Sequence, residues 1–350
     1  MMKNEFRSKR RYTVLTLILL ITVTAIAGAI LFKLQFDYLT RPEDVEIDKT
    51  YDRYYAFISE SEDTVFWQEV YESVKKEGEE HNICVEDFAS EMGSRYTAAE
   101  RTRLAVWSDV DGIIAEGSSS ALKSALIEAD EAGIPVVLVG NDNTEVPRKS
   151  FVGVSRYDMG LLYARQIAGL SKKLLNDRDS VNVMILNGAE ESGAAQDLLI
   201  NTIYESLTND ADLTGRIYFN TREIQTAGSF AAQEAVMDLL LESEAEGEVP
   251  DILVAFSGDI TNSSYQALID LNLIGRCNII GYYISDTIRD AIENENIYAT
   301  IMTDADTMGK SAFSALEEYT ESGYVSEYFA VDAYVLTKDS LAEETVGDEE

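Results

Sequence analysis

Short apolar runs alternate with stretches of helical periodicity along most of the chain. Val136–Val139 and Ile252–Ala255 are uniformly apolar, which is typical of strands buried on both faces of a sheet. Between such runs, apolar residues recur three or four positions apart, as in Leu122–Ala129, which predicts amphipathic helices. Strands that alternate with amphipathic helices favour parallel sheets with helices on both faces.

The same pattern gives the expected order of elements. Strands are expected at Tyr54–Ile58, Ile83–Val85, Gly112–Ala115, Val136–Val139, Val181–Leu186, Arg216–Phe219, Ile252–Ala255, Asn278–Gly281, Ile297–Met302 and near Phe329–Val335. Helices are expected at about 64–80, 96–107, 122–129, 157–175, 192–207, 229–241, 261–271, 286–294 and 308–321. About eleven strands are too many for one comfortable open sheet, so two sheets in two lobes are predicted.

An uncharged apolar segment, Thr13–Phe32, precedes this alternation. At about 1.5 Å per residue, a helix of this length spans roughly 30 Å, the hydrocarbon thickness of a bilayer. Residues 1–33 carry six basic residues and one acidic residue, so we expect this end in the cytoplasm and everything after Lys33 outside. The expectation is a single-pass anchor in the cell membrane with an extracytoplasmic body.

A cleaved signal peptide is the alternative interpretation of this segment. Small-x-small sites occur at Ala25–Ala27 and Ala27–Ala29, but they lie inside the apolar run, which also exceeds the usual signal length of about 7–15 residues. No cysteine follows the run closely, so a lipid-modified cysteine is excluded. Under either interpretation the body is extracytoplasmic.

The charge balance limits the possible partners. The 350 residues include 28 Lys and Arg against 63 Asp and Glu, a formal net charge of -35. Residues 1–33 contribute +5, so the remainder carries -40, and such a surface repels nucleic-acid phosphates. We interpret the excess acid as a solvated outer face. The tail Leu341–Glu350 has five acidic residues and no periodicity, so it is expected to be disordered.

Candidate chemistry for an enzyme is sparse. The single histidine, His81, makes His-based metal sites and a Ser-His-Asp set improbable. Neither a Gly-x-Gly-x-x-Gly fingerprint nor a Gly-Lys-Ser/Thr phosphate loop occurs, so no cofactor is expected. The two cysteines, Cys84 and Cys277, allow at most one disulfide. No catalytic and no metal-binding residues are predicted.

An ordered set of segments resembles type I periplasmic binding proteins, the ribose- and galactose-binding group related to the ligand domains of LacI-type repressors. The resemblance covers about Tyr54–Lys338. It is carried by Phe57-Ile58-Ser59, Val65-Phe66-Trp67, Val110–Ile114, Ala129–Val139, Phe151–Val154 with Gly160, Pro250–Asp259, Ile279–Tyr282 and Ala299–Gly309. The apolar anchor stands where a repressor has its DNA-reading headpiece, which excludes the transcription-factor branch.

The resemblance implies two Rossmann-like lobes joined by three crossovers that form a hinge. The crossovers are expected near Val154–Ser155, Thr303–Asp304 and Glu327–Tyr328. The resemblance also places Cys84 and Cys277 in different lobes, which implies two buried thiols without a disulfide. The implied organisation is a stub and anchor (1–33), a linker (34–52), an N-terminal lobe (53–154 plus 304–328), a C-terminal lobe (155–303 plus 329–340) and the acidic tail (341–350).

The candidate site follows from a general rule. In open parallel sheets, ligands bind beyond the carboxyl ends of the strands, where loops and helix N-termini meet. Residues at these ends are polar and aromatic, which suits a neutral polyhydroxylated ligand. The candidate ligand-binding residues are Asp63, Phe66, Trp67, Asn141, Asp142, Gln196, Gln225, Asp259, Tyr283 and Thr303. The alternatives are core packing for Phe66 and Trp67, helix caps for Asp63 and Asp259, and an Asx-turn for Asn141 and Asp142.

Several positions depart from the sugar-binding pattern that the resemblance implies. Gly140-Asn141 stands where an Asp-Arg pair is common, and Gln196 lies where a second arginine is usual. Tyr283 replaces an aspartate, and Thr303 replaces the hinge glutamine. The fold is therefore expected to be shared, whereas the pentose-type site is not.

The function predicted first is capture of a small polar solute, a sugar or a similar molecule, for delivery to an ABC permease. The alternative is a receptor that reports ligand binding to a membrane partner such as a histidine kinase, which a fixed anchor favours. Catalysis is the third and weakest alternative. Genes next to this one would separate transport from sensing.

Overall fold

The computed structural model describes residues 50–59, 65–88, 96–117, 120–143, 145–188, 193–225 and 230–347. The predicted anchor Thr13–Phe32, most of the 34–52 linker and Asp63 lie outside these residues. Within the described ranges, no helix is both long enough and apolar enough to cross a membrane. Residues 51–350 form one compact unit of the chain.

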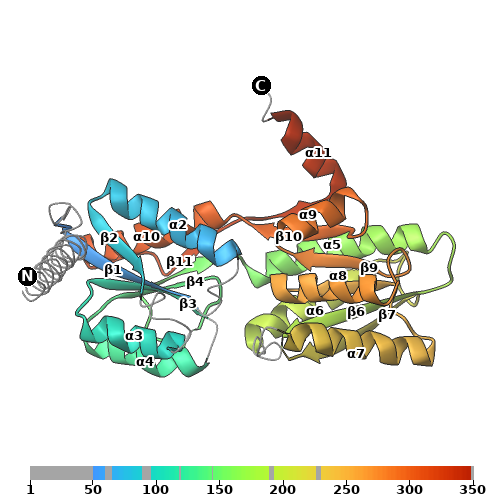
Figure 1. The fold of residues 1–350 in the computed structure, drawn as a ribbon, viewed down its shortest axis with the longest axis horizontal. Helices are drawn as coiled ribbons and strands as arrows, with labels where there is room; N and C mark the ends of the chain where they lie inside the picture. Colours follow the sequence, from blue (N-terminus) through green and yellow to red (C-terminus); the bar gives the residue numbers. More distant parts are fainter. Residues whose placement is uncertain are drawn as a thin grey trace, which may run out of the picture. The chain divides into compact units, whose positions relative to one another are not determined.

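Two six-stranded sheets divide this unit into a first and a second lobe (Figure 1). The first lobe contains β1 (Arg53–Ile58), α2 (Val65–Glu80), β2 (Ile83–Asp87), α3 (Ala98–Trp107), β3 (Gly112–Glu116), α4 (Ser120–Glu131), β4 (Val136–Val139), β5 (Ser150–Gly153), α10 (Ala305–Ser322) and β11 (Tyr328–Ala330). The second lobe contains α5 (Arg156–Leu174), β6 (Val181–Gly188), α6 (Ala194–Thr208), β7 (Ile217–Ile224), α7 (Ala231–Glu246), β8 (Ile252–Ala255), α8 (Gly258–Asp270), β9 (Asn278–Tyr282), α9 (Asp286–Glu293), β10 (Ala299–Thr303), β12 (Ala333–Leu336) and α11 (Lys338–Gly347).

Both sheets are doubly wound, as the alternating pattern predicts. The first has the strand order β11-β5-β4-β3-β1-β2 and is parallel throughout, and the second has the order β12-β10-β9-β8-β6-β7 with β12 alone antiparallel. Every residue of β3, β4 and β8 is buried, because helices cover both faces of the sheets. The strand order reverses at β1 in the first sheet and at β6 in the second, which gives each lobe a topological switch point.

Three chain crossings connect the lobes. Two fall at the predicted places, between β5 and α5 and between β10 and α10, where Ser155 and Asp304 cap the following helices. The third lies at 331–332, between β11 and β12, and not at Glu327–Tyr328 as predicted. Tyr328 belongs to the first sheet because it pairs with Phe151, stacks on its ring and donates a hydrogen bond to the Gly153 carbonyl at 3.0 Å.

The expectation of a disordered tail is wrong for residues 341–347, which lie in α11. The Ser340 hydroxyl accepts a hydrogen bond from the Thr337 amide at 2.8 Å, at the start of this helix. Leu341 is buried, and Lys338 forms an ion pair with Glu295 next to α9 at 3.2 Å. The acidic composition indicated solvation, whereas these local hydrogen bonds and the buried Leu341 lie at the start of a helix that composition alone did not predict.

Both cysteines are free thiols, one in each lobe, as expected. Cys277 is buried, and the burial raises the pKa of its thiol. Cys84 is half-buried and not fully buried as predicted, because β2 is an edge strand of its sheet.

Helices α2 and α10 approach each other closely at Gly309. A Cβ atom placed there would lie 2.6 Å from the Val70 carbonyl oxygen and 2.6 Å from Ser73 Cβ. We therefore expect Gly309→Ala to destabilise the fold by about 1–3 kcal/mol through overpacking. Gly169→Ala is the matched control on α5, where the nearest atom would be the Tyr298 hydroxyl at 3.7 Å, and it should stabilise by about 0.5–1 kcal/mol. Urea midpoints measure both, and shifts of the same sign would contradict this account of the α2–α10 contact.

Candidate functional site

The carboxyl ends of the strands carry most of the predicted site residues. Phe66 and Trp67 lie in the first turn of α2, which follows β1, and Asn141 follows β4. In the second lobe, Gln196 and Asp259 lie in the first turns of α6 and α8, and the remaining residues, Gln225, Tyr283 and Thr303, lie at the ends of β7, β9 and β10. Asp63 is the one candidate outside the described residues.

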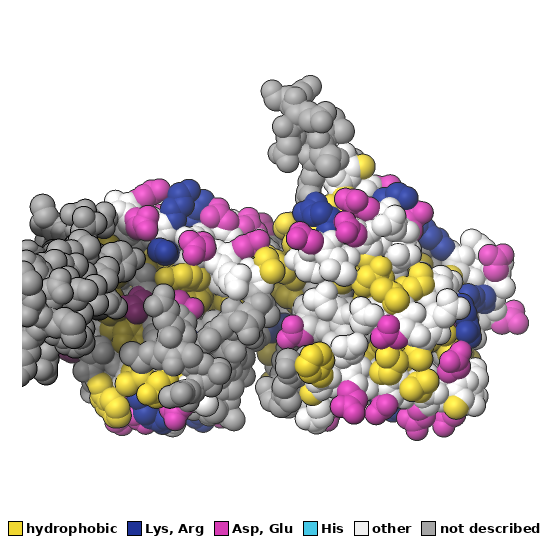
Figure 2. All heavy atoms as spheres, in the orientation of Figure 1, with side chains coloured by type: hydrophobic (Ala, Val, Ile, Leu, Met, Phe, Trp, Pro, Cys, Tyr) yellow, Lys and Arg dark blue, Asp and Glu magenta, His cyan; other side chains and the backbone are white. Residues whose placement is uncertain are grey.

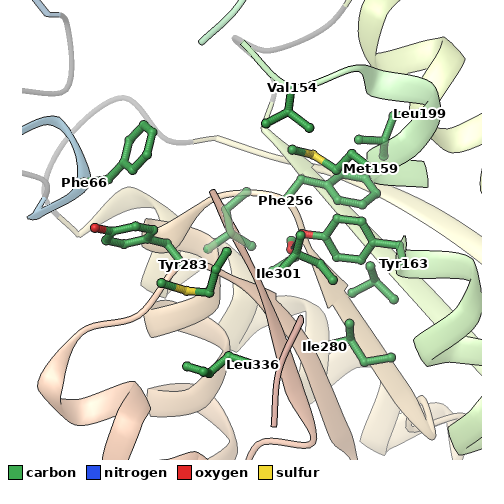
Figure 3. Packing of buried hydrophobic residues seen from close by; sticks show 14 of the residues in the cluster. Phe66, Val154, Met159, Tyr163, Leu199, Phe256, Ile280, Tyr283, Ile301 and Leu336 are labelled. Atoms are coloured by element: carbon green, nitrogen blue, oxygen red, sulfur yellow. Dashed lines mark hydrogen bonds between the residues drawn. The ribbon is translucent and has the colours of Figure 1, made fainter. Parts of the chain in front are cut away.

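Aromatic rings from both lobes meet at these strand ends. The Phe66 ring lies edge-on to the Tyr283 ring at 5.0 Å and to the Tyr282 ring at 6.4 Å, and Figure 3 shows Phe66 and Tyr283 facing one another. Phe66 also contacts Trp67 at 5.1 Å. The structure therefore brings together Phe66, Trp67 and Tyr283 among the predicted residues and adds Tyr282, which the sequence did not single out.

Trp67 packs into the interior of the first lobe. Its side chain is 7% exposed and lies 6.4 Å from the Phe57 ring. Gly140 permits this packing, because a Cβ atom there would lie 2.9 Å from the indole ring. The residue thus has the core-packing environment that the sequence left open as an alternative.

Thr303 is buried at the end of β10 and is joined to the aromatic group. Its hydroxyl is hydrogen-bonded to the Tyr282 hydroxyl at 3.0 Å. The Tyr282 backbone is held in turn by Thr261, whose hydroxyl accepts from the Tyr282 amide at 2.9 Å. These bonds fix the end of β9 relative to β10 and α8.

Asn141 and Asp142 are both engaged by arginines. Arg156, at the start of α5 in the second lobe, donates a hydrogen bond to the Asn141 side-chain oxygen. Arg148 binds both carboxylate oxygens of Asp142, with Nε at 2.5 Å and Nη2 at 2.8 Å. Asp142 therefore has an ion-pair role in its own loop, with both oxygens occupied.

Two buried amide side chains lie at the end of β6 and the start of α6. Gln196 is 3% exposed and Asn187 is 6% exposed. The Gln196 Nε2 donor and the Asn187 Oδ1 acceptor are buried without a hydrogen-bond partner. A buried polar atom without a partner is costly and calls for an explanation, and at the carboxyl end of a strand a bound ligand is one. Gln225, by contrast, is exposed beyond the edge strand β7.

Asp259 carries the carboxylate at the end of β8. It lies in the first turn of α8, whose cap is the Ser257 hydroxyl and not Asp259. The residue is exposed to solvent, although the atoms packed around its carboxyl group partly desolvate it and raise its pKa. A carboxylate in this environment gains free energy by accepting hydrogen bonds from a ligand.

A buried charged cluster lies at the strand ends of the first lobe and was missed by the sequence reasoning. Arg101 on α3 is 2% exposed, donates to the Ser59 carbonyl and pairs with Asp87 at 3.3 Å. The Ser59 hydroxyl donates to the buried Glu116 carboxylate at 3.1 Å. Arg101 lies one turn after the helix cap Thr97. Helical periodicity gave only a weak indication that this charged side chain points into the interior of the lobe.

Charged side chains of both signs lie on the surface of both lobes. Figure 2 shows Asp and Glu side chains scattered over the visible face of both lobes, with Lys and Arg between them. A surface hollow of about 420 Å³ lies at the amino-terminal end of β5, and its lining includes Lys149, Tyr319 and Arg148, the ion-pair partner of Asp142. Within the described parts of the chain, no group of three or more His, Cys, Asp or Glu residues could hold a metal ion.

Comparison with known proteins identifies the family. The model of the periplasmic binding protein domain matches residues 55–323, so the chain belongs to this family. The expected resemblance to type I sugar-binding members is consistent with the solved structures of the same fold. No curated protein matches the chain.

Three solved structures illustrate the similarity of fold. GanP, a glucose-galactose binding protein from Geobacillus stearothermophilus, is 19% identical with a TM-score of 0.69, over 83% of this chain and 99% of that one. A carbohydrate transporter solute binding protein from Agrobacterium radiobacter, in complex with D-arabinose, is 14% identical with a TM-score of 0.70, over 85% and 98%. A chain of the XylFII-LytSN complex is 22% identical with a TM-score of 0.64, over 83% and 99%.

Proposed function

We propose that this chain is an extracytoplasmic binding protein that captures a small polar solute, a sugar or a similar polyol, between its two lobes. The observation that carries the proposal is the pair of buried, unpartnered amide atoms of Asn187 and Gln196 beside the switch point of the second sheet. One donor, one acceptor and the Asp259 carboxylate suit hydroxyl groups, each of which donates and accepts.

Aromatic groups supply the second half of the proposed recognition. Phe66 and Tyr282 lie at the lobe boundary, where ring faces and edges can cover the apolar C–H patches of a polyol. The ligands named for two structures of the same fold, glucose-galactose and D-arabinose, support this class of solute. Delivery to an ABC permease, and attachment to the cell membrane through Thr13–Phe32, belong to the same proposal and are supported by the family and the charge pattern.

A receptor function is the second candidate. A protein of this fold has been solved together with a second protein, as the XylFII-LytSN complex, so assembly with a protein partner is compatible with the architecture. A membrane partner such as a histidine kinase would then read the ligand-bound arrangement of the lobes. Co-purification from membranes with and without ligand separates delivery to a permease from binding to a kinase.

A thermal-shift screen of the full chain tests the proposed function. Sugars, polyols, nucleosides and amino acids are tested one at a time, and we expect one monosaccharide or polyol to stabilise the chain. At a concentration of 100 times Kd the shift should be roughly 5–10 °C. Gln196→Ala should abolish the shift, whereas Gln266→Ala, an exposed glutamine that bonds Asp270, should leave it unchanged. Stabilisation by none of these compounds would contradict the proposal.

A further inference from the structure

One hydrogen bond joins the lobes far from the chain crossings in sequence. The Tyr283 hydroxyl, at the end of β9 in the second lobe, donates to the Glu69 carboxylate on α2 in the first lobe, 214 residues away. Glu69 lies one helical turn after Phe66, whose ring contacts Tyr283 edge-on at 5.0 Å. Each lobe therefore contributes both an apolar and a polar group to one contact.

The surroundings of Tyr283 favour this contact. Its side chain is buried, and desolvation together with the Glu69 carboxylate raises the pKa of the hydroxyl, so it stays protonated as a donor. A hydrogen bond to an ionised acceptor is about twice as strong as a neutral one. Phe66 and Tyr282 pack beside the ring, which limits the positions that the hydroxyl can take.

The backbone of Tyr283 is held in an unfavourable conformation. Its φ angle is +59°, in the left-handed region. The other described non-glycine residues with positive φ are Asn82, Asp109, Asn272 and Glu295, which are all polar, whereas Tyr283 is a buried aromatic. A bulky residue in this region is strained and persists where the surrounding contacts compensate for the strain. The Tyr283 amide donates to the Ile301 carbonyl at 2.8 Å within the second lobe, and the contacts of the Tyr283 ring and hydroxyl with α2 add to this restraint.

We propose that Glu69 and Tyr283 form a tether across the lobe boundary that restricts the hinge of the ligand-free chain. The three crossings allow the lobes to rotate about short connecting segments, as hinged domains do. The tether adds a reversible restraint between α2 and β9 and so narrows the range of lobe arrangements that a ligand meets. Its loss should shift the ratio of restricted to unrestricted arrangements by roughly tenfold or more.

Pulsed electron-electron double resonance measures the distance between two spin labels, and applied to the full, ligand-free chain it tests the tether. Spin labels are placed on cysteines introduced at Glu131 on α4 and Glu242 on α7, with Cys84 replaced by serine, while Cys277 is buried. The parent chain should give a narrow distance distribution. Tyr283→Phe and Glu69→Ala should each broaden it, Glu69→Gln should broaden it less, and the double variant should add nothing.

Tyr55→Phe is the matched control, because the Tyr55 hydroxyl donates to Glu317 at 2.7 Å within the first lobe alone. It should leave the distance distribution unchanged. A parent-like distribution in both Tyr283→Phe and Glu69→Ala, or equal broadening in Tyr55→Phe, would overturn the tether. The measurement uses no ligand, so its result is independent of whether the proposed sugar-binding function is correct.

Discussion

Replacing Arg101 with methionine should destabilise the first lobe by about 2–4 kcal/mol, because the change removes two hydrogen bonds of a buried guanidinium. Arg101 binds the half-buried Asp87 carboxylate and the Ser59 carbonyl, and the Ser59 hydroxyl in turn donates to the buried Glu116 carboxylate. Methionine retains the apolar stem but leaves Asp87 and the Ser59 carbonyl without the guanidinium. The expected lowering of Tm is roughly 4–15 °C, measured by circular dichroism.

Arg103 provides the control two residues along the same helix. It also pairs with a carboxylate, Glu128 at 3.0 Å, but the two side chains are 32% and 46% exposed. Exposed ion pairs contribute about 0–1 kcal/mol, so Arg103→Met should lower Tm by no more than a few degrees. Equal decreases in Tm for the two substitutions would show that the burial of Arg101 does not account for its contribution to stability.

The fold was predictable because strand and helix leave different apolar periods in the sequence. Val136–Val139 and Ile252–Ala255 match β4 and β8 residue for residue, since buried parallel strands are uniformly apolar. The edge strand β7 extends to Ile224, beyond the predicted Phe219, because its solvent-facing positions are polar. Helices α8 and α10 each begin three residues before the predicted start, directly after the caps Ser257 and Asp304.

The site was only partly predictable. The position of a residue at a strand end gives the location of its backbone, but it does not identify the neighbouring residue that binds its side chain. Asp142 follows β4 as expected, yet Arg148 occupies both of its oxygens. Tyr283 directly follows β9 as expected, but its partner Glu69 comes from a helix 214 residues away. Asn187 lies at the end of an apolar strand, and only the burial of its side-chain oxygen without a hydrogen-bond partner makes it a candidate for ligand binding. Such pairings depend on tertiary packing, which periodicity does not report.

Asp259→Asn should weaken ligand binding by about 10–100-fold and at the same time stabilise the ligand-free chain at neutral pH. A hydrogen bond from a ligand hydroxyl to a carboxylate contributes about 1.5–3 kcal/mol, most of which the amide loses. The gain in stability arises because desolvation disfavours the ionised carboxyl group, as its raised pKa indicates. Isothermal titration with the ligand from the thermal-shift screen measures the first effect.

The pH dependence gives the second effect a definite sign. Below the unfolded-state pKa of about 3.9, the carboxyl group is protonated in both states and its desolvation costs nothing. As pH rises through the raised folded-state pKa, the unfolded chain gains more from ionisation, so the parent loses stability. The Tm difference between Asp259→Asn and the parent should therefore be near zero at acidic pH and positive at pH 7.

Asp339→Asn is the control for this pair of effects, because Asp339 is likewise an exposed acid in the first turn of a helix, α11, but lies far along the chain from the candidate site. An exposed acid near a helix N-terminus stabilises the helix dipole by about 0.3–1 kcal/mol, so its removal should lower stability slightly and leave ligand affinity unchanged. Opposite changes in stability for the two substitutions would distinguish a carboxylate that binds a ligand from one that stabilises its helix. A loss of stability in both would remove Asp259 from the proposed site.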